Sequence, residues 1–203
     1  MSRIAYTPAD LIAFEKEVAR RFENREIRAP VHLSGGNEDQ IISIFKDIGE
    51  ADWVFCTYRS HYAALLHGIP PDWIMGQIIA GKSMLLSNPD YRFLSSAIVG
   101  GMVPMAVGTA EAIQRQGSSE RVWVFVGDMA ATTGIFHEAV HYADGHNLPI
   151  QFVVEDNGLS TDSPTQACWG RPLGNLLPMS SRIRRYTYTR VWPHVNSGKW
   201  VDF

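Results

Sequence analysis

Two polar clusters in the middle of the sequence have the residue types needed to bind a metal ion together with a phosphate. The first is the run 127–134, GDMAATTG, which follows the apolar segment 122–126. The second is the run 155–158, EDNG, which follows the apolar segment 150–154. A tight turn of small residues that opens a helix presents free backbone N–H groups and the positive end of the helix dipole. The first cluster therefore suits a phosphate.

Asp128 in the first cluster would repel a bare phosphate, because both groups are negative. A divalent cation between them removes the conflict, and Mg²⁺ prefers octahedral coordination by oxygen atoms. Asp128 and Asn157 would offer such oxygens from two strand ends. The alternative is that Asp128 caps the following helix and Asn157 forms an Asx turn. For either residue alone the alternative is the commoner arrangement, whereas the pair at matching strand ends favours a metal site.

The segments that must position the two clusters have the pattern of a parallel βαβ unit. Residues 122–126 and 150–154 are continuous apolar runs, typical of strands buried on both faces. Between them, residues 134–146 have an apolar stripe at helical spacing. Ligands of open parallel sheets bind beyond the carboxyl ends of the strands, where both clusters lie. We therefore expect an α/β fold with a doubly wound, mainly parallel sheet and helices on both faces.

Other elements are expected around this unit, and no repeat or linker divides the chain. Predicted elements are helices over 11–21 (capped near Thr7–Asp10), 39–46 and 71–79, and a last strand over 186–191. We expect a single domain over residues 1–203. It would have an N-terminal helical arm at 1–50 and a loop-rich C-terminal segment at 158–203.

The composition argues against some classes of protein. Eighteen Lys and Arg against 21 Asp and Glu leave a formal charge of −3, which disfavours a basic nucleic-acid-binding surface. Charged residues are only 19% of the chain, so part of the surface is expected to be covered by other chains. Cys56 and Cys168 lie far apart, and the N-terminus has no targeting pattern. A cytoplasmic protein with free thiols is the simplest expectation.

The segment 93–110 has no charged residue over 18 positions, a length that could span a membrane. It contains Pro104 and three glycines and is followed directly by Glu111. These residues favour a wholly buried helix rich in small side chains, and no membrane partner is expected.

The two clusters together resemble the thiamine-diphosphate motif, usually written GDG…NN. Gly127-Asp128 is followed 29 residues later by Asn157. The surrounding sequence is similar to one family, the α chain of the first, thiamine-dependent component of the 2-oxo acid dehydrogenase complexes. Further similar blocks are TYRSH at 57–61, IVGGMVP at 98–104, FHEA at 136–139 with Leu148-Pro149, and YTY at 186–188 before His194. The resemblance runs over about 50–165 and 186–195.

The resemblance implies a role for each matching residue. Magnesium would be bound by Asp128, the Asn157 side chain and the Leu159 carbonyl. The diphosphate would be bound in the turn after Gly127 by the backbone N–H groups of Met129 and Ala130, and by the Tyr58 and Arg59 side chains. The backbone of Val99, with Ala97, would meet the aminopyrimidine. His61 and His194 would stand near the reacting end or the diphosphate, as proton carriers or donors to an anion; the alternatives are a surface histidine at a helix start and a histidine of a tail.

The sequence departs from the family pattern at four places. Met129 replaces the third residue of GDG, which leaves its N–H usable provided that the turn does not require a positive φ. Asp156 replaces the first Asn of the pair. The family's GGSMH block is reduced to GKSML at 81–85, and residues 163–186 leave no room for an extra βα unit. The chain is therefore identified as a compact version of the α chain.

The resemblance also implies that this chain forms half of an active site. A β-type partner would carry the pyrimidine-binding domain and the activating glutamate, in an α₂β₂ assembly with residues 93–110 near a subunit contact. The leading function is decarboxylation of a 2-oxo acid, with transfer to a lipoyl-bearing acyltransferase. Two alternatives stay open: a decarboxylase, carboligase or transketolase-like enzyme without a lipoyl acceptor, and a non-catalytic scaffold subunit. A nucleotide-binding domain is disfavoured, because the sequence has no G-x-G-x-x-G or Walker loop.

Overall fold

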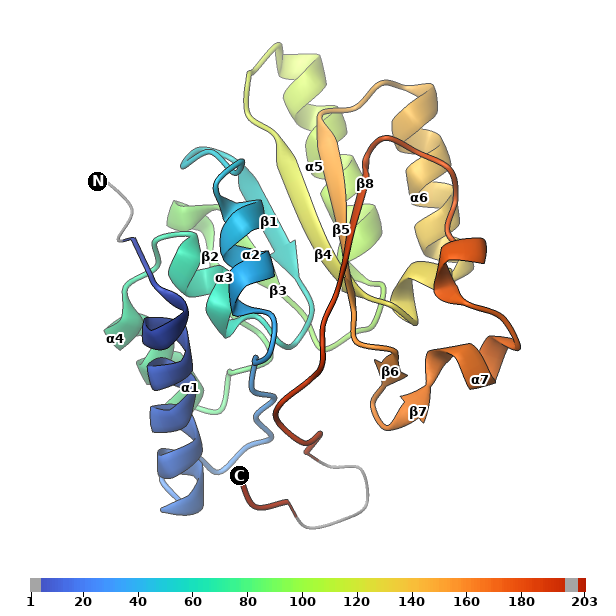
Figure 1. Ribbon diagram of the computed structural model, residues 1–203. Coiled ribbons are helices and arrows are strands. Elements are labelled where there is room, and N and C mark those ends of the chain that lie inside the picture. Colours follow the sequence, from blue (N-terminus) through green and yellow to red (C-terminus); the bar gives the residue numbers. More distant parts are fainter. Residues whose placement is uncertain (1–4, 196–200) are drawn as a thin grey trace.

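The computed structural model describes residues 5–195 and 201–203, and its centre is a six-stranded sheet (Figure 1). The strands are β1 Trp53–Cys56, β2 Ser87–Asn88, β3 Phe93–Ser95, β4 Val122–Gly127, β5 Ile150–Asp156 and β8 Ile183–Thr187. Their order across the sheet is β2-β3-β1-β4-β5-β8. All neighbours pair in parallel except β2, which is antiparallel to β3. The predicted α/β fold with a mainly parallel sheet is confirmed.

The predicted βαβ unit is present as β4, α6 Gly134–Gly145 and β5. The first five residues of β4 are buried, as the continuous apolar run indicates. β4 and β5 pair in register from Val122 opposite Ile150 to Gly127 opposite Glu155. Because parallel strands end at the same edge, this register brings the two polar clusters side by side.

Helices cover both faces of the sheet (Figure 1). α5 Met102–Gln116 and α6 pack on one face, over Val122, Val124 and Phe152. The other face carries α1 Pro8–Glu23, α2 Glu38–Phe45, α3 His61–Leu66 and α4 Pro71–Ile79. On that face Phe45 stacks on Phe125, with 5.6 Å between the ring centroids.

The N-terminal helix begins where its sequence predicts. Thr7 and Asp10 form a reciprocal capping box, in which each side chain accepts a hydrogen bond from the backbone N–H of the other. Leu11 and Val18 of α1 are fully buried in the same core as the helices α2 to α4. The helix α1 is therefore packed against the rest of the chain.

The segment 93–110 differs from its prediction as a single, wholly buried helix. Residues 93–95 form the strand β3, and the helix α5 begins only at Met102. Gly100 has φ +77°, a conformation that breaks any helix, and Ile98 and Val99 beside it are 73% and 61% exposed. Among residues 5–195 and 201–203, no helix has the length and apolar character needed to cross a membrane.

The last strand lies a few residues earlier than predicted, at Ile183–Thr187 instead of 186–191. The difference arises because the strand contains two arginines, whereas a buried strand is recognised in a sequence by a run of apolar residues. Arg184 lies over the Trp123 ring and pairs with Asp47, and Arg185 pairs with Asp156. Before β8 the chain forms β6 Leu159–Ser160, β7 Ser163–Pro164 and α7 Thr165–Trp169.

Candidate functional site

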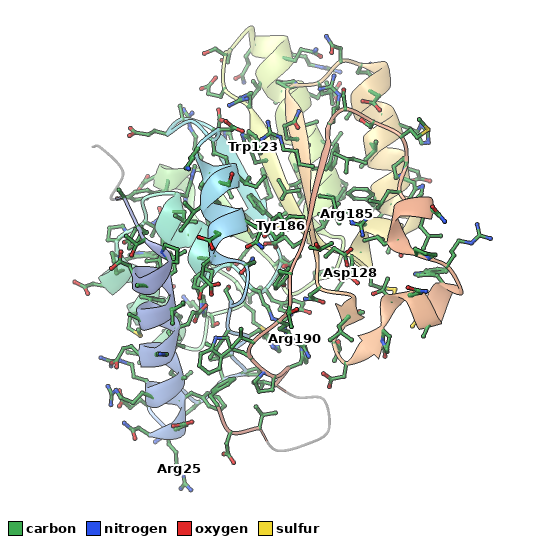
Figure 2. All side chains as sticks on the ribbon, in the orientation of Figure 1. Arg25, Trp123, Asp128, Arg185, Tyr186 and Arg190 are labelled. Atoms are coloured by element: carbon green, nitrogen blue, oxygen red, sulfur yellow. The ribbon has the colours of Figure 1, made fainter. Side chains whose placement is uncertain are left out.

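The two polar clusters meet in one pocket at the carboxyl ends of β1, β4 and β5. Nine of the eleven predicted site residues line it: Tyr58, Arg59, Val99, Gly127, Asp128, Met129, Ala130, Asn157 and Leu159. Glu155 and Tyr188 line it as well. Figure 2 shows Asp128 at this end of the sheet, with Arg185 nearby. The remaining two predicted residues, His61 and His194, lie outside the lining.

Asp128 is an almost fully buried carboxylate, with 1% of its surface exposed. Burial raises its pKa, and the nearby Asp156 adds to this effect, whereas a hydrogen bond donated by the Thr165 hydroxyl opposes it. A buried anion of this kind gains strongly from a cation, because the cation replaces the lost interaction with water. Asp128 is therefore suited to bind a metal ion.

Asn157 forms the Asx turn that was the alternative to metal binding. Its Oδ1 accepts a hydrogen bond from the Leu159 N–H at 2.9 Å, and its Nδ2 donates to the Tyr188 hydroxyl at 3.0 Å. An amide oxygen has two lone pairs, so Oδ1 keeps one for a metal ion. The turn thus orients the amide without using up its capacity as a ligand.

Met129 and Asp156, the two motif departures, both fit the local backbone. Met129 has φ −67° and ψ −38°, so the turn does not require glycine there. The Asp156 carboxylate accepts a hydrogen bond from the Gly158 N–H at 3.0 Å and pairs with Arg185 at 2.6 Å. Asp156 therefore stabilises the turn between Asn157 and Leu159, and Arg185 balances its charge.

Arg59 is the main cationic group of the pocket, and it has unused hydrogen-bonding capacity. Its Nη2 lies 3.0 Å from His194 Nδ1, and its guanidinium lies 5.3 Å from the centre of the Tyr58 ring. Its Nε is buried and has no hydrogen-bond partner among the described residues. A guanidinium with such a donor, at the edge of a pocket, is suited to a planar anionic group.

His194 reaches the site indirectly, through Arg59. Its ring stacks on His32, with 4.3 Å between centroids and 28° between planes. Burial lowers the pKa of His194, and Arg59 and Arg190 lower it further. His194 is therefore disposed to be a neutral ring beside Arg59.

His61 lies away from the pocket, and it is not a surface residue. It is fully buried, with Nδ1 2.9 Å from Glu15 Oε2 and Nε2 2.9 Å from Ser83 Oγ. Both ring nitrogens therefore have partners within the chain, and the position offers no support for the expected role as a proton carrier. The reason is that α3 begins at His61 and directs this side chain towards α1 instead of towards Arg59 two residues earlier.

Glu155 and Tyr188 line the pocket but are not among the residues predicted from the sequence, and neither is His32, whose ring packs against Tyr58 and His194. Burial raises the pKa of Glu155 to about 7, and its carboxylate accepts hydrogen bonds from the Tyr186 hydroxyl and from Asn37 Nδ2. One signal for Glu155 was available, because it lies in a strand two residues before Asn157, and residues two apart along a strand point to the same face. His32 had no such signal, since it lies far from the motif in the sequence.

Replacing Arg59 by lysine should weaken the affinity of the pocket for a diphosphate group offered with Mg²⁺ by about tenfold. A lysine keeps the charge but loses the fork of parallel donors that matches a diphosphate oxygen pair. Isothermal titration calorimetry measures the change, with Arg171→Lys, at an exposed arginine outside the pocket lining, as the matched control. Equal affinities of Arg59→Lys and the control would contradict a diphosphate contact.

His32 should make the fold sensitive to acid. Burial lowers its pKa to about 3, helped by His194 and Arg59, so the folded chain holds this ring neutral. The unfolded chain binds a proton below about pH 6.5, so stability falls as the pH falls below that value. The free energy of unfolding should drop by about 2 kcal/mol between pH 7.5 and pH 5 because of this ring.

Urea unfolding of His32→Gln at both pH values tests this contribution. The variant should lose about 2 kcal/mol of the acid sensitivity of the parent. The matched control, His141→Gln at an exposed position of α6, should keep it. An unchanged pH dependence in His32→Gln would show that the His32 ring is not held neutral.

Most of the pocket lining lies within the part of the chain that is similar to known proteins. A sequence model of the dehydrogenase E1 component family matches residues 7–168, which include all nine predicted residues of the pocket lining. The chain is 28% identical over 165 residues to the α subunit of acetoin:2,6-dichlorophenolindophenol oxidoreductase of Bacillus subtilis, covering 76% of this chain and 50% of the relative. It is 30% identical over 163 residues to the chloroplastic pyruvate dehydrogenase E1 component subunit alpha-3 of Oryza sativa subsp. japonica, covering 71% and 38%.

A third relative is the pyruvate dehydrogenase E1 component subunit alpha of Porphyra purpurea, 30% identical over 161 residues, covering 71% of this chain and 47% of the relative. The alignments with these three relatives span about half of their length or less.

Proposed function

Because this chain belongs to the dehydrogenase E1 component family, we propose that it is an α-type subunit that binds the magnesium and diphosphate half of thiamine diphosphate. One observation carries the proposal. Nine residues from four separate stretches of the chain, 58–59, 99, 127–130 and 157–159, line a single pocket at the carboxyl ends of adjacent parallel strands. Open parallel sheets bind their ligands at such an edge.

The residues of the pocket fit the chemistry of a diphosphate bound with a divalent cation. The buried Arg59 Nε, to which no other described residue forms a hydrogen bond, suits an anion, and the buried carboxylate of Asp128 suits a cation. A Cβ atom on Gly127 would meet no atom within 4 Å, so the turn is open for a ligand to approach its backbone. A lone anion would be repelled by Asp128 and Glu155, which favours magnesium between the charges.

In this arrangement Asp128, Asn157 and the Leu159 carbonyl would hold Mg²⁺. The N–H groups of Met129 and Ala130 would donate to the diphosphate. Tyr58 and Arg59 would bind its outer oxygens, and the Val99 backbone would meet the aminopyrimidine. His194 would keep Arg59 in place through the contact to its guanidinium. When bound, thiamine diphosphate supplies the electron sink that allows a 2-oxo acid to lose CO₂.

A β-type partner chain would complete the active site, in an α₂β₂ assembly. The pocket has a volume of about 60 Å³, well below the roughly 150 Å³ of an engineered apolar cavity that binds benzene. Most of a thiamine diphosphate molecule would therefore lie outside the pocket, against another surface. The partner would carry the pyrimidine-binding domain and the activating glutamate, and the exposed Ile98 and Val99 would lie near the contact.

The proposed reaction is the decarboxylation of a 2-oxo acid. The acyl group that remains would be transferred to a lipoyl-bearing acyltransferase. A second candidate is the oxidation of acetoin, with electrons passed to an acceptor such as 2,6-dichlorophenolindophenol. It is supported by the relatives from Bacillus subtilis and Cupriavidus necator, both of which are named as acetoin:2,6-dichlorophenolindophenol oxidoreductase subunits.

Co-expression with a β-type chain, followed by calorimetry and a dye-reduction assay, tests the proposal. Micromolar binding of thiamine diphosphate that needs Mg²⁺ and disappears in Asp128→Ala would support it. Reduction of 2,6-dichlorophenolindophenol with pyruvate, but not with acetoin, would favour the 2-oxo acid, and the reverse would favour the second candidate. A complex that forms but binds no cofactor would indicate a scaffold subunit instead.

A further inference from the structure

The Met129 side chain has no role in the proposed function, which uses only its backbone N–H. Met129 stands where the family motif has glycine, and its right-handed backbone carries the side chain without strain. The thioether sulfur accepts a hydrogen bond from the Trp169 indole N–H, with 3.1 Å between Nε1 and Sδ. Trp169 is the last residue of α7 and is 49% exposed, so burial alone does not hold it there.

The short helix α7 is attached at both ends to the turns that would hold the cofactor. At its start, Thr165 donates its hydroxyl hydrogen to Asp128 Oδ2 and its backbone N–H to the Gly158 carbonyl at 3.0 Å. At its end, Trp169 contacts Met129. The Thr165 side chain is almost fully buried, so its contact with Asp128 is shielded from water.

We propose that Met129 is a positioning residue, whose contact with Trp169 fixes α7 so that Thr165 holds the Asp128 carboxylate in place for magnesium. An indole N–H usually finds a partner, and sulfur next to an aromatic ring is a favourable contact. A five-residue helix has little stability of its own, so its position depends on contacts at its ends. The motif departure at position 129 therefore supplies the second attachment. This inference rests on the proposed function for its magnesium step, but not for the attachment of α7.

Hydrogen exchange of the cofactor-free chain tests the attachment by itself. Met129→Leu keeps the size of the side chain and removes the sulfur acceptor, and Trp169→Phe keeps a ring and removes the N–H. Both should speed exchange of the amides in residues 165–170 by about fivefold. Met129→Gln, which offers a carbonyl oxygen as acceptor, should restore slow exchange. Met179→Leu, at a fully exposed methionine, is the matched control. Unchanged exchange in Met129→Leu would overturn the proposal, as would equally fast exchange in Met129→Gln.

Calorimetry with thiamine diphosphate and Mg²⁺, on the complex of this chain with its co-expressed β-type partner, tests whether the attachment acts through Thr165. Met129→Leu and Thr165→Val should each weaken binding by about fivefold, and the double variant should be no weaker than Thr165→Val alone. Thr109→Val, which removes an exposed hydroxyl on α5, should leave affinity unchanged. If the fold-losses of affinity in the two single variants multiply in the double variant, the two residues act independently and the coupling between them is overturned. Absence of binding in the parent would overturn the proposed function and the magnesium step together, while the exchange result would still decide the attachment of α7.

Discussion

Asp128→Asn should abolish the binding of thiamine diphosphate in the presence of Mg²⁺, with a loss of more than about 100-fold in affinity. Loss of a group that only supports a metal ligand already lowers metal affinity by roughly 10–100-fold, and Asp128 would be a ligand itself. The same change should stabilise the chain without cofactor. The Asp128 carboxylate is buried, and burial raises its pKa, because the charged form loses its hydration. A neutral amide of the same shape avoids the free-energy cost of burying a charge.

Calorimetry and thermal unfolding at neutral pH measure the two effects on one sample. The matched control is Asp90→Asn, at an exposed aspartate outside the pocket lining, which should change neither quantity. A lower melting temperature for Asp128→Asn would show that this carboxylate serves the fold and not a ligand. A gain in stability together with a loss of affinity is expected of a binding site, because a buried charge that a ligand needs destabilises the chain when the ligand is absent.

Gly36→Ala should destabilise the fold by about 3 kcal/mol. Two independent reasons add here. Gly36 has φ +91°, which a residue with a Cβ rarely adopts, and a Cβ at this position would lie 2.0 Å from the Thr189 carbonyl oxygen. The backbone oxygen cannot rotate away as a flexible side chain would, so the segment around Thr189 must move.

Urea unfolding measures this loss, and Gly76→Ala is its control. Gly76 lies within α4, a Cβ there meets no atom within 4 Å, and alanine favours a helix by up to about 1 kcal/mol over glycine. The control should therefore be more stable than the parent, whereas Gly36→Ala should be less stable. Because His194 follows Thr189 by five residues, Gly36→Ala should also weaken the contact between His194 and Arg59. A stable Gly36→Ala variant would contradict the close approach of the two segments.

The sequence by itself determined the centre of the fold and the meeting of Asp128 with Asn157. The reason is that both follow from local signals, the apolar runs of β4 and β5 and the helical stripe between them. A parallel register then places the two strand ends at one edge. Family motifs added Tyr58, Arg59 and Val99, each in a short segment that matches the family.

Only the tertiary structure decided where the histidines lie and what surrounds Glu155. Asn37 and Glu155 are 118 residues apart, and His61 meets Glu15 across 46 residues. No local pattern indicates which of several elements will pack against a side chain, because that choice depends on how both faces of the sheet are covered. The place of His61 in the sequence motif therefore suggests a site residue, whereas its packing in the folded chain keeps it out of the pocket. β8 was misplaced for the same reason, since its arginines are accommodated by Asp47, Asp156 and Trp123, which only folding brings beside them.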